Sequence, residues 1–510
     1  MANNYNIAKN TLFLYFRMLC TIAVSLYTSR VVLQVLGVED YGTYQVVGGI
    51  SSMLSYVING SLASGSSRFI IYEIGKGTSG KLRETFSTLM TIHILIGIAV
   101  ILLAEIFGLY FLYNKLVIPE ERFGAALFTF HLSIIATFIG ITQVPYTALI
   151  IGHERMNIYA YMSIIEAVLK LSIVYVLMFS NWDKLELYAL LLFIVQTGIT
   201  LFYRFYCIRS YKDEASFKLI WDKRLIKKVL SFSSWNLIEN TSISLNNQGT
   251  ILLLNMFFNP GIVTARSIAN IVSMTANNFI GNFRTAINPQ IIKKFSSNDQ
   301  NGSKLLLLES TKYSYFLMLI LSLPIFVTAE DLLCLWLEQV PEYATVFLQF
   351  AIVTALFGVF DQSFYTAFTA KGQIKESTIF SVLIGYISFP VIYILFKMKC
   401  SPISLAWVSL ISSAILAFFI KPLLLHRIMG YSWKELKILF KSCLIVTLIS
   451  IPVPILFYFF EKQIFHVQLI RFFSLIVICL LCTICSIWYI GLSHDMRVQL
   501  IRLIKNKIKR

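Results

Sequence analysis

The chain has 510 residues, of which 57% are hydrophobic and only 14% charged, and its formal net charge is +17. A soluble protein carries about 25% charged residues, so the composition excludes a soluble globular domain. Apolar runs of about 20 residues recur along the chain, and each can cross the hydrocarbon of a bilayer as a helix. The runs do not alternate in polarity as barrel strands would. We therefore predict an all-α integral membrane protein.

The apolar runs predict about fourteen transmembrane helices, arranged as two pseudo-symmetric six-helix lobes around a central cavity, with a final pair of helices. No small-residue cleavage site follows the first run, so we expect no removable signal peptide. In chain order, the predicted helices are 11–34, 42–66, 86–112, 123–150, 159–180, 187–206, 230–256, 265–289, 312–334, 343–369, 378–396, 403–423, 438–460 and 469–491. The corresponding domains are an N-terminal lobe at 1–228, a C-terminal lobe at 229–432, the final helix pair at 433–493 and a basic tail at 494–510.

Lysine and arginine are distributed unevenly between the two sides that this layout defines. If the N-terminus is inside, thirty of the 43 basic residues fall in inner segments and seven in outer segments. Cytoplasmic loops collect basic residues, so both termini are predicted to be cytoplasmic. The same bias explains the positive charge without nucleic acid. The tail 494–510 fits either an amphipathic helix on the anionic inner leaflet or a solvated segment.

Two short segments suggest an internal duplication. Tyr146-Thr147-Ala148 and Tyr365-Thr366-Ala367 each end the fourth predicted helix of a lobe and precede a short inner loop. Each lobe has an even number of helices, so the two repeats insert in the same direction. Such repeats are related by an axis along the membrane normal and can enclose a cavity that opens alternately to either side.

Three predicted helices carry more polar side chains than contact with lipid allows. In 42–66 the polar residues are mostly small, and close helix packing is a sufficient explanation. In 230–256 and 265–289 amides are frequent, which predicts a hydrated cavity for a polar substrate. We expect the first and second predicted helices of each lobe to line it. The amides singled out as substrate-binding candidates are Asn240, Asn247, Asn277 and Asn278.

Four arginines within or at the ends of predicted helices are further binding candidates. Arg17 and Arg30 lie in the first helix, and Arg266 and Arg284 lie in 265–289. Charges in a membrane are costly and usually functional, and a guanidinium can donate two parallel hydrogen bonds to a phosphate. The alternative is that these side chains reach out to the interface.

Two carboxylates, Asp361 and Glu239, lie within predicted helices and are candidates for coupling transport to an ion. A carboxylate in a membrane can carry a proton or bind Na⁺. The alternative is a hydrogen-bonded contact between helices. Coupling to H⁺ or Na⁺ is thus expected, and no other cofactor is.

No segment has the features of an enzyme. No loop exceeds about 25 residues, which leaves no room for a soluble catalytic domain, and the chain lacks a phosphate-binding loop. The six histidines show no metal-binding spacing. Cys479, Cys482 and Cys485 are best explained as small residues in a membrane helix.

One stretch resembles a known family. Leu36-Gly37-Val38-Glu39-Asp40-Tyr41-Gly42, continuing to Ile50 and to Glu73-Ile74-Gly75-Lys76-Gly77, is similar to the Wzx-type polysaccharide flippases. These are bacterial polysaccharide-biosynthesis membrane proteins of the multidrug/oligosaccharidyl-lipid/polysaccharide exporter superfamily. The predicted helix count and the two halves agree with that family.

This resemblance implies a function. Such proteins translocate an undecaprenyl-diphosphate-linked oligosaccharide across the bacterial inner membrane by alternating access, for O-antigen, capsule or exopolysaccharide assembly. The implied partners are the lipid-linked oligosaccharide, membrane lipids, a polysaccharide polymerase and a chain-length regulator, and a monomer is expected. Within the superfamily, an ion-coupled multidrug exporter or a peptidoglycan-precursor flippase is the alternative. A polysaccharide polymerase fits less well, because the outer loops are short.

Overall fold

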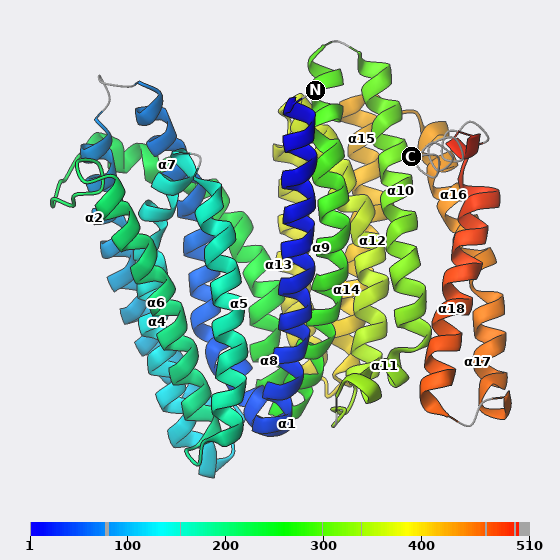
Figure 1. The fold of residues 1–510 in the computed structure, drawn as a ribbon, viewed down its shortest axis with the longest axis horizontal. Helices are drawn as coiled ribbons and strands as arrows, with labels where there is room; N and C mark the ends of the chain where they lie inside the picture. Colours follow the sequence, from blue (N-terminus) through cyan, green and yellow to red (C-terminus); the bar gives the residue numbers. More distant parts are fainter. Residues whose placement is uncertain are drawn as a thin grey trace. The chain divides into compact units, whose positions relative to one another are not determined.

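The computed structural model of the chain describes residues 2–76, 81–153, 155–297, 299–337, 339–464, 467–493 and 496–498. It does not describe the side chains of 2–21, 64, 156, 157, 159, 160, 232, 235, 282, 285, 286, 289, 296 and 461–464. Within these residues the fold is all α-helical and contains no strand, which confirms the predicted fold class (Figure 1). Contacts divide the chain into two compact units. Unit 1 comprises Met1–Thr264 and Gly385–Pro402, and unit 2 comprises Ala265–Ile384 and Ile403–Arg510. The domains predicted from the sequence divide the chain by internal duplication, whereas these units are defined by contacts. The predicted domain boundaries therefore stay a prediction.

The helices of the first half of the chain are long and joined by short loops. They are α1 (Ala2–Gly75), α2 (Leu82–Leu103), η2 (Ala104–Gly108), α3 (Leu109–Asn114), η3 (Glu120–Arg122), α4 (Phe123–Gly152), α5 (Met156–Phe179), α6 (Lys184–Ser210), α7 (Lys223–Ser244), η4 (Leu245–Gly249) and α8 (Thr250–Phe257).

The second half of the chain continues in the same way. Its helices are α9 (Pro260–Ser296), α10 (Gln300–Val327), α11 (Ala329–Trp336), α12 (Ala344–Lys371), α13 (Lys375–Lys397), α14 (Ile403–Ala414), η5 (Ile415–Ile420), α15 (Lys421–Met429), α16 (Trp433–Ser450), α17 (Pro452–Ile464), α18 (Gln468–Ser486) and η6 (Ile487–Gly491). Apart from 496–498, the predicted basic tail lies outside the described residues.

Eleven helical segments of the described chain are long and apolar enough to cross a membrane, which makes the chain a multi-pass membrane protein. One of them, Ile22–Gly75, includes the second half of the first predicted helix and all of the second. The predicted helices 230–256 and 265–289 correspond to α7–α8 and α9, which are helical but are not among the eleven. Their many amides lower the hydropathy on which the criterion depends. The count of fourteen stays a prediction.

Some helices extend beyond the apolar segments that hydropathy identifies. The predicted loop at 290–311 is mostly helical, because α9 continues to Ser296 and α10 begins at Gln300. Asp299 caps α10 by accepting a hydrogen bond from the backbone N–H of Gly302 at 2.9 Å. Hydropathy marks the part of a helix inside the bilayer, whereas capping side chains determine where the helix begins.

The stretch that resembles the flippase family forms a bend in α1. Gly37 has φ 78° and ψ 171°, a conformation that interrupts the helix and that glycine adopts without strain. Shortly after it, Asp40 accepts a hydrogen bond from Nε of Arg122 at 2.6 Å, and Arg122 also donates from Nη1 to Asp183 at 2.6 Å. One guanidinium thus joins the bend in α1 to the starts of α4 and α6.

Gly42 allows a close approach within unit 1. A Cβ atom added at Gly42 would lie 2.0 Å from the carbonyl oxygen of Pro260, at the start of α9. Next to this contact, Thr264 donates from Oγ1 to the carbonyl oxygen of Val38 at 2.7 Å. Backbone therefore packs against backbone here, and only glycine fits at position 42.

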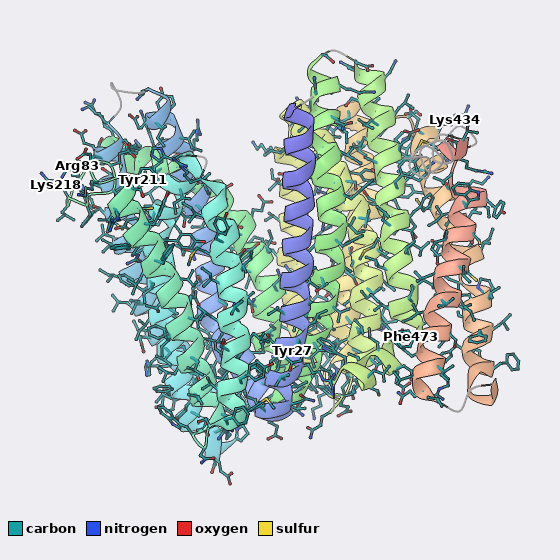
Figure 2. All side chains as sticks on the ribbon, in the orientation of Figure 1. Tyr27, Arg83, Tyr211, Lys218, Lys434 and Phe473 are labelled. Atoms are coloured by element: carbon teal, nitrogen blue, oxygen red, sulfur yellow. The ribbon has the colours of Figure 1, made fainter. Side chains whose placement is uncertain are left out.

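Three basic side chains can be located in the two units. Figure 2 shows Arg83 and Lys218 at the same end of unit 1, where α2 begins and the loop after α6 lies. Within unit 2, Lys434 lies near the start of α16 and Phe473 lies toward the opposite end of the C-terminal helices (Figure 2). All three basic residues belong to segments that the charge distribution assigns to the inside.

Replacing Gly42 by Ala is expected to destabilise the purified protein by about 1–3 kcal/mol, the usual cost of forcing extra atoms into a packed interior. The matched control is Gly198→Ala in α6, where an added Cβ meets no described atom within 4 Å. A thermal unfolding assay in detergent compares the two variants. Equal melting temperatures for both would contradict the close contact at Gly42.

Candidate functional site

A polar cavity of about 520 Å³ lies inside unit 1, within the range of about 300–1,000 Å³ that ligand pockets occupy. Of the nineteen described residues that line it, none is charged, and twelve carry a hydroxyl or an amide. The lining comes from α1 (Tyr44, Gly48, Ser51, Ser52, Ser55, Tyr56, Asn59, Gly60), α4 (Thr129, Leu132, Ser133, Ala136, Thr137), α6 (Ala189, Leu192, Phe193, Gln196), and α7 with η4 (Asn240, Gln248). We call it the unit 1 cavity.

Helical spacing explains how these side chains meet. Thr129, Ser133 and Thr137 follow one another at intervals of four residues and therefore share one face of α4. The same interval relates Ser51 to Ser55 in α1. Hydroxyls from two helices thus face each other, and Ser51 and Ser133 share a hydrogen bond of 2.7 Å between their Oγ atoms.

The hydrogen bonds of the unit 1 cavity are only partly satisfied. Asn59 donates from Nδ2 to Ser55 Oγ at 3.0 Å, while its Oδ1 is buried without a partner among the described residues. The hydroxyl of Thr129 is also buried and unpartnered within the described chain. Buried polar atoms are normally hydrogen-bonded. The cavity therefore holds donors and acceptors that suit a neutral polar ligand.

The predicted site residues of unit 1 differ in their relation to this cavity. Asn240 lines it and donates from Nδ2 to Ser61 Oγ at 3.4 Å. Arg30 and Glu239 are half-buried, and Asn247 is exposed on the π-helical turn η4; none of these three is among the lining residues. The helix containing Arg17 is described, but the side chain of Arg17 is not.

In unit 2, Arg284 donates a hydrogen bond from Nη2 to Oε1 of Gln362. Arg266 lies over the ring of Phe347, with 5.9 Å between its Cζ and the ring centroid. Asn277 donates to the backbone carbonyl of Ser273 at 3.0 Å, and Asn278 is exposed.

Asp361 forms an ion pair with a residue that sequence reasoning missed. Its Oδ1 lies 2.9 Å from Nζ of Lys421, and the Lys421 side chain is only 3% exposed. From the sequence, Lys421 counts as one of the inner basic residues. In the structure it is buried, because α14, η5 and α15 form one continuous helix that runs past it to Met429. The signal available in the sequence was its position inside the predicted helix 403–423, two residues before the end.

A second cavity, of about 620 Å³, lies in unit 2 and is almost entirely apolar. Phe360, Phe418 and Phe440 pack against one another in its wall, with ring centroids 5.0–5.6 Å apart. Its few polar groups include the Tyr315 hydroxyl, which shares a hydrogen bond of 2.9 Å with Thr447. In the described chain, no cluster of His, Cys, Asp or Glu could hold a metal ion.

Comparison with known proteins identifies the family. Residues 7–295, more than half of the chain, match the family described as polysaccharide biosynthesis protein, and the chain belongs to that family. The family resemblance predicted from the sequence is confirmed. A search of the curated proteins found no match.

Solved structures share the fold. The lipid II flippase MurJ, in its inward closed conformation, aligns with a TM-score of 0.70 at 13% identity, over 93% of this chain and 97% of MurJ. An inward-facing multidrug resistance MATE transporter of the MOP superfamily aligns with a TM-score of 0.65 at 14% identity, over 80% of this chain and 96% of that one. A MOP superfamily transporter from Pyrococcus furiosus is described as having a binding pocket of reverse polarity. It aligns with a TM-score of 0.56 at 15% identity, over 83% of this chain and 96% of that one. Family and fold point to a transporter or flippase rather than an enzyme.

The unit 1 cavity can be tested by cysteine labelling in a background whose eight native cysteines are replaced by serine. Ser52→Cys is expected to react with a water-soluble maleimide, because Ser52 is an exposed residue of the cavity lining. Ser51→Cys is expected to react much more slowly, because Ser51 is 2% exposed. Ser172→Cys on α5, exposed but outside the cavity lining, controls for lipid-facing positions. Equal labelling at all three positions would contradict a water-filled cavity.

Proposed function

We propose that this protein translocates a diphosphate-linked, lipid-anchored oligosaccharide across the bacterial inner membrane. Family membership and the shared fold support a flippase or transporter. The observation that carries the finer proposal is the unit 1 cavity, which is uncharged and lined by twelve hydroxyl- or amide-bearing side chains.

A saccharide fits this cavity chemically. Sugar hydroxyls both donate and accept, as do the serine, threonine and amide groups of the lining. Tyr44 and Tyr56 add aromatic surface, against which the apolar faces of sugar rings can pack. A drug exporter for cations would instead favour carboxylates, and the described lining of the unit 1 cavity contains none. The saccharide assignment is therefore preferred over the multidrug exporter of the same superfamily.

The charged groups of the substrate need a different environment. The arginines predicted from the sequence, Arg30, Arg266 and Arg284, suit a diphosphate because guanidinium groups bind phosphate oxygens in pairs. In unit 2, Arg284 keeps one buried nitrogen, Nε, without a partner among the described residues, as does Arg266. We assign the diphosphate to Arg284, because Arg266 lies eighteen residues earlier in α9, about 27 Å along the helix, and one diphosphate cannot bind both.

The remaining features of the proposal follow from the sequence and the family. Alternating access moves the substrate, and H⁺ or Na⁺ coupling through Glu239 is the expected energy source. The excess of basic residues in the predicted inner segments supports cytoplasmic termini. A polysaccharide polymerase and a chain-length regulator are the expected partners in O-antigen, capsule or exopolysaccharide assembly.

The proposal is tested by complementation of a strain that lacks this protein. Asn59→Leu and Asn240→Leu each remove an amide from the unit 1 cavity, and each is expected to lower surface polysaccharide at least about tenfold, consistent with loss of one or two buried hydrogen bonds. The lipid-linked oligosaccharide should accumulate on the inner leaflet.

Ser172→Leu is the matched control, because it places the same side chain on an exposed face of α5 and should leave polysaccharide unchanged. Membrane abundance of every variant is measured by immunoblot. Wild-type polysaccharide in both asparagine variants at normal abundance would refute a saccharide site in the unit 1 cavity.

A further inference from the structure

The buried lysine of unit 2, Lys421, lies next to an irregular turn of its helix. Lys421 follows directly on the π-helical turn η5 and precedes Pro422, which has no N–H to donate to the preceding turn. Its Nζ lies 2.9 Å from Asp361 Oδ1 and donates to Ser377 Oγ at 2.7 Å. It also lies 5.7 Å from the ring centroid of Tyr365. The ammonium group is therefore held from several sides at a position far from the helix end at Met429.

The carboxylate of this ion pair is more accessible than the ammonium. The side chain of Asp361 is 29% exposed, against 3% for Lys421. Asp361 lies ten residues, about 15 Å of helix, before the end of α12 at Lys371. An approaching ligand would therefore reach the carboxylate before it reached the lysine.

A second cation lies near the same carboxylate. Arg284 donates a hydrogen bond from Nη2 to Oε1 of Gln362, the residue that follows Asp361 in α12. In the described part of the chain, this group thus combines two cations with one carboxylate. An excess positive charge inside a membrane is costly, and Nε of Arg284 is buried without a partner among the described residues. The group is one anion short of neutrality.

This charge balance argues against a cation at Asp361. A sodium ion bound there would lie beside an ammonium and a guanidinium, and like charges at such distances repel. An anion would instead be attracted to both cations and would compete with Asp361 for them.

We propose that Asp361 is an internal counter-ion, which neutralises Lys421 and Arg284 in the empty transporter and is displaced from them by a phosphate group of the substrate. The inference rests on the proposed function, which supplies a diphosphate. Exchange of one anion for another keeps the cations paired throughout. The carboxylate then helps to release the phosphate, because it competes for the cations after translocation.

The test measures diphosphate binding to the purified full-length protein by calorimetry, with inorganic pyrophosphate and farnesyl diphosphate as separate probes. Asp361→Asn preserves the shape of the side chain and removes its charge. It is expected to bind the diphosphate at least about tenfold more tightly than the wild type, since the competing anion is gone. Glu342→Gln, an exposed outer-loop position, changes the net charge equally and should leave binding unchanged.

Two further variants keep the result interpretable. Lys421→Met should bind at least about tenfold more weakly than the wild type. If it does not fold, the double variant Asp361→Asn/Lys421→Met removes both charges, should fold, and should bind more weakly than Asp361→Asn. Tighter binding of both probes by Asp361→Asn assigns the site to diphosphate in general, and tighter binding of farnesyl diphosphate alone assigns it to the lipid-linked form.

The proposal is overturned if Asp361→Asn binds both probes no more tightly than the wild type. It is also overturned if that variant loses only its response to a proton or sodium gradient, since Asp361 would then be the coupling group. A parallel flipping assay with lipid-linked oligosaccharide separates the two proposals. If the wild-type protein flips the lipid-linked oligosaccharide but Asp361→Asn binds diphosphate no more tightly, only the counter-ion proposal is rejected. If Asp361→Asn binds diphosphate more tightly but the wild-type protein does not flip the oligosaccharide, only the proposed function is rejected.

Discussion

A polar group inside a bilayer can bind only protein, ligand or trapped water, and the structure of this chain depends on that constraint. The backbone satisfies it by remaining helical. Side chains satisfy it in two ways. Lys421 is held by Asp361 and Ser377. The hydroxyls and amides of the unit 1 cavity meet one another across helices, and some of their atoms have no partner among the described residues. The ion pair allows a charged side chain to be buried, and the cavity keeps hydrogen-bonding atoms that a ligand can use.

The stretch that carries the family resemblance has a structural explanation. Gly37 bends α1, Asp40 binds Arg122, and Gly42 packs against the backbone of Pro260. Each position requires its residue type for a different reason: a left-handed backbone conformation, a carboxylate for a guanidinium, and the absence of a side chain. The motif therefore reports on the architecture of unit 1, and the ligand must be inferred from other residues.

The sequence predicts the fold well and the site only in part. Hydropathy identifies the membrane-crossing helices because each must match the thickness of the bilayer, but it does not show where helices end beyond the bilayer. The amides of α7 were recognisable, and Asn240 does line the unit 1 cavity. The serines of 42–66 were attributed to helix packing, although that helix was also expected among the lining, and Ser51, Ser52 and Ser55 do line the unit 1 cavity. Ser133 of α4 and Gln196 of α6 were not singled out, because a cavity is formed by several helices and no single helix shows it. Lys421 was missed because a charge at the end of an apolar run cannot be told from a loop charge without the tertiary fold.

The π-helical turn before Lys421 has a consequence for how such chains diverge. A π turn accommodates one more residue than the α-helical turn it replaces, so it behaves as a single-residue insertion absorbed within a helix. Every residue after the insertion is rotated by about 100° relative to an uninterrupted helix, since an α-helix has 3.6 residues per turn. A relative that lacks this extra residue in Ile415–Ile420 would present a different position to Asp361. Alignments of the family should therefore be examined for one-residue gaps at this turn, because such a gap decides which side chain faces the carboxylate.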